Sequence, residues 1–139
     1  DHRRPAHPAR PVLVITGDGE MLMGVGSLAS IAQQAPPNLA IVVQDNEHYG
    51  ETGMQQTATA HGTDLVTMAE GAGIKATMRV TAPEQVPALV AATRAKAGPF
   101  FAVAKVDAAN LPLVLPPREG AILQARMREA LLGPAAHLA

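Results

Sequence analysis

The stretch PVLVITGDG, residues 11–19, places a run of apolar and β-branched side chains directly before Gly-Asp-Gly. Such a run, ended by glycine, predicts a short strand that is buried on both faces. A second run, LAIVVQDN at residues 39–46, also ends in an acid and an amide. Apolar residues at helical spacing predict a helix between the two runs, over about residues 26–35. Together these elements predict a right-handed parallel strand–helix–strand unit.

Two more apolar runs, at residues 76–80 and 99–106, predict a third and a fourth strand. Helices are expected over about residues 64–69, 81–97 and 119–132, from capping residues at their starts and from glycines or prolines at their ends. Strands that alternate with helices predict an α/β domain of three layers, αβα, with a mostly parallel central sheet. In such sheets, ligands bind at the carboxyl ends of the strands.

Length and composition narrow the class of protein. The 139 residues, 47% hydrophobic and 17% charged, suffice for one hydrophobic core. We expect one domain over residues 12–133, with a basic, proline-rich arm at residues 1–11 and a short tail at residues 134–139. A net charge of −1 argues against a nucleic-acid partner, and the absence of cysteine excludes disulfides. No apolar stretch approaches the length of a membrane span and no signal-peptide pattern is seen, so we expect a cytoplasmic protein with no membrane partner.

The ends of the first two strands carry oxygen ligands. Asp18 follows the first strand and Asn46 follows the second, so adjacent parallel strands would bring both side chains to the same edge of the sheet. A carboxylate, an amide oxygen and a backbone carbonyl could form half of an octahedral Mg²⁺ shell, which leaves room for phosphate oxygens and a water. Gly17 and Gly19 would let the backbone approach an anion closely. The residues alone thus predict a magnesium diphosphate site, although Gly-Asp-Gly is also a good turn sequence.

The segment EHYGETGMQQTATAHG, residues 47–62, has neither a helical nor a strand period. A connection of this length in a small domain is usually functional. His48 and His61 lie in this segment, and we consider both as proton donors to a substrate. Loop histidines are more often surface residues, and no spacing of His, Asp and Glu here resembles a zinc site.

A competing motif is GVGSLA, residues 24–29, which matches the glycine pattern of dinucleotide-binding domains, with Asp45 near the expected distance. Those glycines must form the tight turn directly after the strand. Gly24 lies seven residues beyond Gly17, so we do not favour a dinucleotide site.

Gly-Asp-Gly, a spacer of 25 residues, and then Asp-Asn at residues 45–46 resembles the signature of enzymes that depend on thiamine diphosphate. Residues 17–57 are similar throughout to the diphosphate-binding, C-terminal-type domain of phosphonopyruvate and sulfopyruvate decarboxylases, including the beta-subunit type. The resemblance implies Mg²⁺ bound by the Asp18 and Asn46 side chains and the His48 backbone carbonyl. It also implies that the cofactor diphosphate and its metal are held by Gly17, Asp18, Gly19, Glu20, Asn46, His48, Tyr49 and Gly50.

The resemblance further implies decarboxylation of a small 2-oxo acid that bears a second anionic group. In the family, a glutamate from a separate pyrimidine-binding domain activates the cofactor, and this sequence contains no such domain. Glu20, Glu47 and Glu51 would lie beside the diphosphate and cannot take that role, so the catalytic glutamate is expected from another chain in a homo- or hetero-oligomer. The alternatives are a carboligase of the acetolactate-synthase type and a cofactor-binding or assembly module without activity of its own.

The start of the domain differs from the pattern of the family. Its members place a further strand and helix before the strand that ends in Gly-Asp-Gly. Only eleven residues precede Val12 in this sequence, and their proline and arginine content does not suit such a helix. The expected structure is therefore a thiamine-diphosphate-binding fold, and two alternatives stay open: the sequence shown is a part of a longer protein, or the N-terminal strand and helix of the fold are missing.

Overall fold

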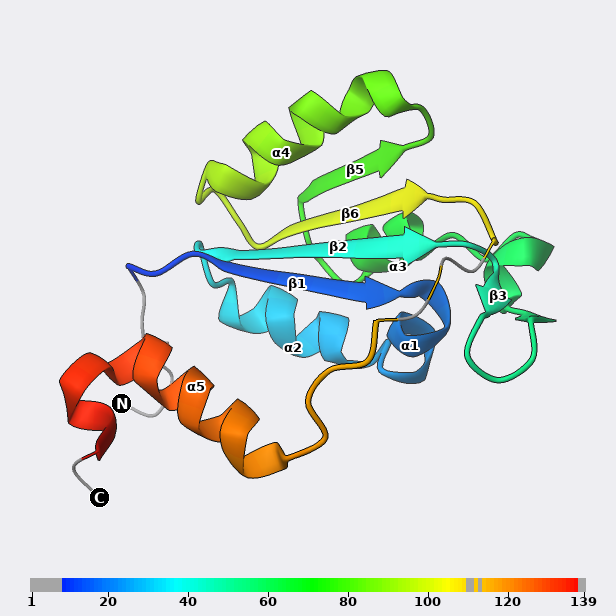
Figure 1. Cartoon of the computed structure of the whole chain (residues 1–139). Helices are drawn as coiled ribbons and strands as arrows, with labels where there is room; N and C mark the ends of the chain where they lie inside the picture. The colour runs from blue at the N-terminus through cyan, green and yellow to red at the C-terminus, as the bar shows by residue number, and fades with distance from the viewer. Residues whose placement is uncertain (1–8, 110–111, 113, 138–139) are drawn as a thin grey trace. The chain divides into compact units, whose positions relative to one another are not determined.

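The structure is a computed structural model that describes residues 9–109, 112 and 114–137 (Figure 1). The chain divides into two compact units, Asp1–Ala109 and Asn110–Ala139, and each is described by itself. Most of the arm predicted at residues 1–11, and the last two residues of the predicted tail, lie outside the described residues.

A parallel sheet forms the centre of the first unit. Its strand order is β1-β2-β6-β5, and all three neighbouring pairs are parallel, which confirms the predicted sheet. In the register between the first two strands, Thr16 lies opposite Val43. The strands are β1 Val12–Gly17, β2 Leu39–Asp45, β5 Ala76–Val80 and β6 Phe100–Lys105.

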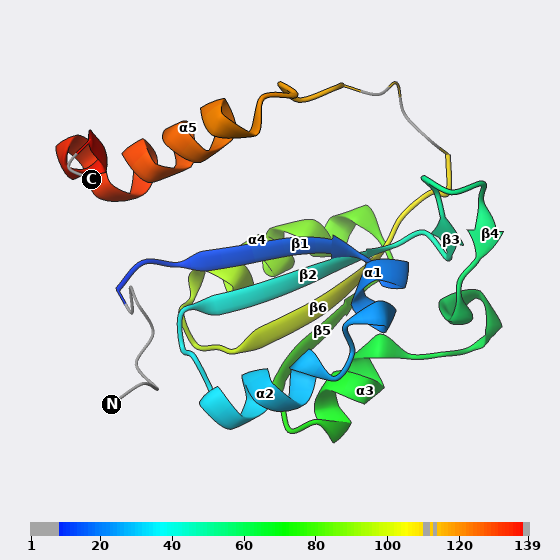
Figure 2. The same ribbon diagram turned by 90° about the horizontal axis from the view of Figure 1, so that it is seen from below.

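Helices cover both faces of this sheet, so the unit has the predicted three layers. One face packs against α1, α2 and α3 and the other against α4, as the two views in Figures 1 and 2 show. Fully buried Phe101 and Val43 lie in the core under the first group, and Phe100 and Ala102 lie under α4. The helices are α1 Asp18–Met23, α2 Ser27–Gln34, α3 Leu65–Gly71 and α4 Val86–Arg94.

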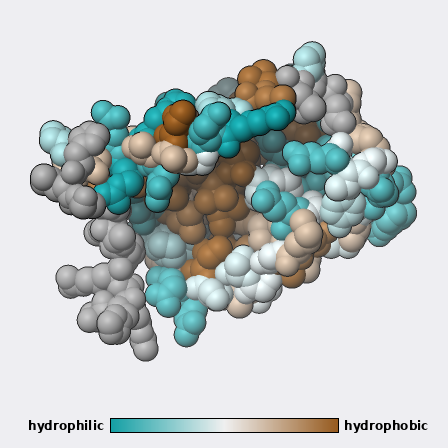
Figure 3. Space-filling model, turned by 60° about the horizontal axis from the view of Figure 1, so that its bottom comes forward, coloured by the Kyte–Doolittle hydropathy of each residue, from teal (hydrophilic) through white to brown (hydrophobic). Residues whose placement is uncertain are grey.

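Strand β1 departs from the sequence prediction. The run at residues 12–15 does form a strand, but it lies at the edge of the sheet, and its four side chains are 40–60% exposed. The expectation of a strand buried on both faces is therefore wrong for β1, whereas it holds for β2. Beside β1 lies an apolar groove of about 260 Å³, visible as a brown depression in Figure 3, which is lined by residues that include Val14, Ile31 and Ile41.

The segment after β2 is more ordered than its sequence suggests. It forms a small antiparallel hairpin from β3 (His48–Tyr49) and β4 (Gln55–Gln56), followed by a 3₁₀ helix at Ala58–His61. The expectation of a long connection without regular structure is therefore wrong. Local pairing of two-residue strands leaves no period that a sequence pattern could reveal.

The second unit contains α5 (Gly120–Leu132) and a 3₁₀ helix at Gly133–His137. The Arg128 guanidinium donates to the carbonyl of Ala136, at 3.1 Å, and so ties the two helices together. The helix predicted at residues 119–132 is thus confirmed. Across the part of the chain that the structure describes, no helix combines the length and the apolar character needed to cross a membrane.

Candidate active site at the carboxyl end of the sheet

The Gly-Asp-Gly segment begins a helix instead of forming a turn. Gly17 ends β1 and is the N-cap of α1, and Asp18 is the first residue of that helix. The first backbone N–H groups of a helix have no acceptor within the helix, so those at the start of α1 remain available. A Cβ atom built on Gly17 would meet no other atom within 4 Å, so space lies open directly beside this backbone.

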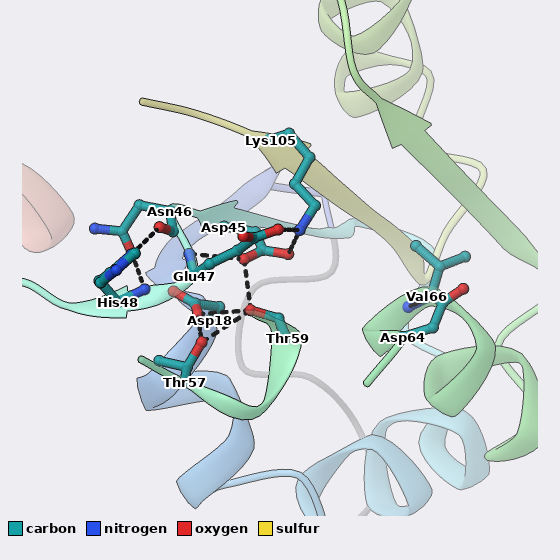
Figure 4. A network of polar contacts seen from close by, with 10 residues as sticks. All are labelled: Asp18, Asp45, Asn46, Glu47, His48, Thr57, Thr59, Asp64, Val66 and Lys105. Carbon is teal, nitrogen blue, oxygen red and sulfur yellow. Dashed lines mark hydrogen bonds and ion pairs between the residues drawn. The ribbon is translucent and has the colours of Figure 1, made fainter. Parts of the chain in front are cut away.

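Asp18 is buried together with two hydroxyl groups from the end of the hairpin segment. Its side chain is 1% exposed, and Thr57 and Thr59 are also buried. The Thr57 hydroxyl donates a short hydrogen bond to Asp18 Oδ2, and the Thr59 hydroxyl lies 3.0 Å from the same oxygen (Figure 4). Among the described residues, no Lys, Arg or His forms an ion pair with Asp18. This carboxylate is therefore hydrogen-bonded but not charge-compensated.

Asp45, at the end of β2, is the second buried carboxylate, and it does have a cation. Lys105, at the end of β6, lies 2.9 Å from Asp45 Oδ2 and 2.5 Å from Glu47 Oε1. Partial burial would lower the pKa of Lys105, but its hydrogen bonds to Asp45 and Glu47 outweigh that effect and raise the pKa above its ordinary value. Thr59 Oγ1 lies 2.8 Å from Asp45 Oδ1 and so connects the two buried carboxylates.

The loop at residues 46–48, which carries two of the predicted metal ligands and is called the metal loop below, follows directly after β2. The Asn46 side-chain oxygen accepts a hydrogen bond of 3.0 Å from the backbone N–H of His48, and the His48 ring lies 2.9 Å from the Asn46 carbonyl. Glu47, between them, has a φ of 62°, a left-handed conformation that costs free energy for a residue other than glycine. The loop is thus held tightly turned, with its two predicted ligands two residues apart.

Gly19 has a specific reason to be glycine. A Cβ atom at this position would lie 2.3 Å from the ring of Tyr49, so a side chain there would collide with the ring. The structure shows that Tyr49 occupies the space of a side chain at this position, and that this contact brings the start of α1 against the loop after β2. The prediction that the backbone at Gly19 approaches an anion stays a prediction.

Among the described residues, the side chains of Glu20, Glu51 and His61 form no hydrogen bond with the two buried carboxylates. Glu20 is exposed and accepts a 2.5 Å hydrogen bond from Thr16 at the end of β1. Gly50 follows β3 in the turn of the hairpin, and Glu51 is exposed in the same turn. His61 is exposed at the end of the 3₁₀ helix.

Thr57, Thr59 and Lys105 are the residues that sequence reasoning missed. The two threonines stand two positions apart in a segment without periodicity, and Lys105 ends a strand 58 residues after Glu47. Only the pairing of β2 with β6 and the path of the hairpin bring these groups to Asp18 and Asp45. In the sequence, the one available signal is that three hydroxyl residues occur close together at positions 52–59.

The donor set suits one hard cation held jointly with a ligand. Asp18 supplies a buried carboxylate without a cation, and the loop supplies an amide oxygen and a backbone carbonyl, all of which Mg²⁺ prefers. Among the described residues, no group of three or more His, Cys, Asp or Glu side chains could hold a metal by itself. The protein groups alone therefore leave the coordination shell incomplete, as expected for a cation that is completed by phosphate oxygens.

A second cavity of about 250 Å³ lies between the ends of β5 and β6 and the start of α3. Asp64 caps α3 by accepting from the backbone N–H groups of Val66 and Thr67, and it pairs with Arg79 at 2.7 Å. Burial would raise the pKa of Asp64, but the hydrogen bonds from Arg79 and Thr67 together outweigh it and lower the pKa to about 2. Asp64 and Arg79, two charged residues that line this cavity, are thus already paired with each other.

Comparison with known proteins gives a consistent assignment. Residues 3–104 match the model of a family described as "Thiamine pyrophosphate enzyme, C-terminal TPP binding domain". The chain is 46% identical over 63 residues to the sulfopyruvate decarboxylase subunit beta of Methanocaldococcus jannaschii, covering 45% of this chain and 34% of that protein. It is 38% identical over 93 residues to the phosphonopyruvate decarboxylase of Streptomyces viridochromogenes, covering 67% of this chain and 23% of that protein. The chain thus spans only about a third or a quarter of the length of these relatives.

Among solved structures, the chain is similar to the transketolase from Campylobacter jejuni, with a TM-score of 0.51 and 16% identity, over 69% of this chain and 15% of that one. At this identity the likeness concerns the fold alone, and it agrees with the predicted thiamine-diphosphate-binding fold. The family match covers the sheet, the Gly-Asp-Gly segment and the metal loop. The chain therefore belongs to the thiamine pyrophosphate enzyme family, in which it corresponds to the C-terminal TPP binding domain.

Proposed function

We propose that this chain is the diphosphate-binding part of a thiamine-diphosphate-dependent decarboxylase that acts on a small 2-oxo acid with a second anionic group. The similarity to proteins named sulfopyruvate and phosphonopyruvate decarboxylase supports this class of substrate. When bound, thiamine diphosphate supplies the electron sink that the loss of CO₂ from a 2-oxo acid requires. The part of this chain is to bind and orient the diphosphate end of the cofactor.

The observation that carries the proposal is the state of Asp18. Asp18 is 1% exposed, and among the described residues no Lys, Arg or His forms an ion pair with its carboxylate, so this hard oxygen ligand is left for a cation. We assign Mg²⁺ to this position, with Asn46 and the His48 carbonyl as its other protein ligands. The open space at Gly17 and the N–H groups at the start of α1, for which the described residues supply no acceptor, support a diphosphate beside this metal.

The proposal includes a partner subunit. Nothing in the described site supplies a glutamate away from the diphosphate end, so the activating glutamate comes from a pyrimidine-binding domain in another chain of a homo- or hetero-oligomer. Relatives named as a subunit beta support such an assembly. His48 and His61 remain candidates for proton transfer to a substrate. A cytoplasmic location remains a prediction.

The exposed edge of the sheet supports a further part of the proposal, namely that an additional strand and helix cover β1. Both faces of a parallel sheet are normally buried under helices, and an unpaired edge strand readily accepts another strand. Val12, Leu13, Val14 and Ile15 leave both faces of β1 exposed instead. We regard the domain predicted over residues 12–133 as a part of this larger fold.

The proposal is tested by assembling the chain with a pyrimidine-domain subunit, thiamine diphosphate and Mg²⁺. CO₂ release is then followed from sulfopyruvate, phosphonopyruvate and pyruvate, and the products are identified. We expect turnover of a 2-oxo acid that has a second anionic group, and no turnover when Mg²⁺ is removed by a chelator. A condensation product would indicate the carboligase alternative. Cofactor binding without turnover in a demonstrated complex would overturn the enzymatic function and leave a binding module.

A further inference from the structure

We propose that Thr57 and Thr59 are positioning residues that hold the Asp18 carboxylate by one oxygen, so that its other oxygen faces the metal. This inference rests on the metal site of the proposed function and assigns a role to two residues outside the proposed ligand set. It also predicts that the site depends on a contact between segments about 40 residues apart in the chain, as the separations of 39 and 41 residues show.

The hydroxyl contacts to Asp18 all fall on one of its two oxygens. Both threonine hydroxyls lie on Asp18 Oδ2, and none of the hydrogen bonds between side chains of the described residues involves Oδ1. The final torsion of an aspartate side chain is intrinsically broad, so an unrestrained carboxylate samples many orientations. The hydrogen bond from Thr57 restricts this rotation, and Thr59 adds a second hydrogen bond to the same oxygen when its single proton points to Asp18 instead of Asp45. They leave Oδ1 as the oxygen that can bind a cation.

The threonines are themselves held by the metal loop. The backbone N–H of Thr57 donates to the carbonyl of Glu47 at 2.8 Å, so the segment that contacts Asp18 is fixed to that loop. Asn46 and His48 belong to the same loop. Formation of the loop therefore fixes the positions of the two loop ligands and the orientation of the Asp18 carboxylate at the same time. Sub-ångström placement of this kind is what outer partners of a metal ligand provide.

Thr59 has more acceptors around it than protons to donate. Its hydroxyl oxygen lies 3.0 Å from Asp18 Oδ2, 2.8 Å from Asp45 Oδ1 and 2.8 Å from the Thr57 hydroxyl, but it carries a single proton. Thr59 can therefore donate to only one carboxylate at a time. Lys105 compensates the charge of Asp45, and a metal on Asp18 would compensate the other. Thr59 thus joins the proposed metal site to the ion pair at the end of β6.

The experiment compares Thr59→Val, Thr57→Val, Thr59→Ser and Thr57→Ser with the unmodified full chain, with Thr93→Val on α4 as the matched control. Thr93 also donates a hydroxyl hydrogen bond, to the carbonyl of Val90, but lies far along the chain from Asp18. The measurements are Mn²⁺ affinity in the presence of excess thiamine diphosphate, by electron paramagnetic resonance, and thermal unfolding of each metal-free variant. The second measurement separates a change in the site from a loss of folding.

We expect each Val variant to bind Mn²⁺ roughly 10- to 100-fold more weakly than the unmodified chain, because this is the usual cost of losing a residue that hydrogen-bonds a metal ligand. The Ser variants, which keep the hydroxyl, and Thr93→Val should bind as the unmodified chain does. Unchanged Mn²⁺ affinity in folded Thr57→Val and Thr59→Val would overturn the inference, as would equal losses in the Val and Ser variants. If Asp18→Ala binds Mn²⁺ as well as the unmodified chain, the proposed function itself fails, and this outcome is distinct from the other two.

Discussion

The carboxyl end of the sheet and the β1 edge depart from ordinary burial in opposite ways. At the carboxyl end, the polar residues Asp18 and Asp45 are 1% and 3% exposed, whereas along β1 the apolar Ile15 is 60% exposed. A buried charge is costly unless it is compensated, and a large exposed apolar surface usually marks a place of contact. Lys105 compensates Asp45, whereas among the described residues no Lys, Arg or His forms an ion pair with Asp18. Asp18 is therefore the group for which we propose a cation, and the β1 edge is the surface for which we propose a covering segment.

The largest effect, on cofactor binding, should come from removing the Asp18 carboxylate at the carboxyl end of the sheet. Asp18→Ala should weaken Mg²⁺-dependent binding of thiamine diphosphate by more than the roughly 10- to 100-fold that an outer-shell loss costs, because it removes a ligand itself. Calorimetric titration of the chain with the cofactor and Mg²⁺ measures this. The control is Asp107→Asn, which changes an exposed carboxylate that accepts a hydrogen bond from the backbone N–H of Ala109 in its own turn. Equal cofactor binding by Asp18→Ala and the unmodified chain would show that Asp18 is not a ligand of the cation. The carboxyl end of the sheet would then not need a cation, which contradicts the difference drawn between the two regions.

The next largest effect is on the free energy of unfolding, and it should differ between isoleucines on two adjacent strands. Ile41→Ala on β2 should lower the free energy of unfolding by about 2–5 kcal/mol, because this side chain is 4% exposed and leaves a cavity. Ile15→Ala on β1 should lower it by less than about 1 kcal/mol, because that side chain is already largely exposed. Urea unfolding of both variants tests the difference. If both substitutions cost the same, β1 is covered in solution.

The third effect concerns the compensated carboxylate. Lys105→Met should destabilise the chain by about 1–2 kcal/mol at neutral pH, less than the cost of breaking a fully buried pair, because Lys105 is 41% exposed. Since its pKa is raised in the folded state, the stabilisation is complete below pH 10.5, its ordinary pKa, and is lost as the pH rises through the higher folded value. Thermal unfolding measures the change, with Lys75→Met as the control. A more stable Lys105→Met variant would show that Asp45 does not need its cation.

The smallest effect should come from the surface pair beside α3. The pKa of Asp64 is about 2 in the folded chain against an ordinary value of 3.8, so its contribution is present above pH 3.8 and is lost as the pH falls through about 2. Both partners are nearly half exposed, at 49% and 46%, so we expect less than about 1 kcal/mol. Unfolding free energies of the unmodified chain and Asp64→Asn between these pH values test this. Parallel pH profiles would contradict the lowered pKa.

The residues at the carboxyl end of the sheet were easier to predict from the sequence than the edge position of β1. Gly-Asp-Gly and Asp-Asn stand at the ends of apolar runs, so the parallel arrangement alone brings Asp18 toward Asn46. The edge position of β1 has no such signal. Its apolar run resembles that of β2, and a run of side chains does not reveal which strands lie beside it.

Local sequence patterns suffice to predict the alternation of strands and helices, the parallel sheet and the residues placed at its carboxyl end. Each of these follows from periodicity, from capping residues or from spacing along the chain. Three-dimensional packing alone establishes that the Thr57 and Thr59 hydroxyls contact Asp18, that Lys105 pairs with Asp45 and that β1 is exposed. Those facts depend on contacts between residues distant in the chain and on the order of strands in the sheet, and neither leaves a local pattern. Burial and charge compensation are properties of the surroundings in space, which several separate segments build together.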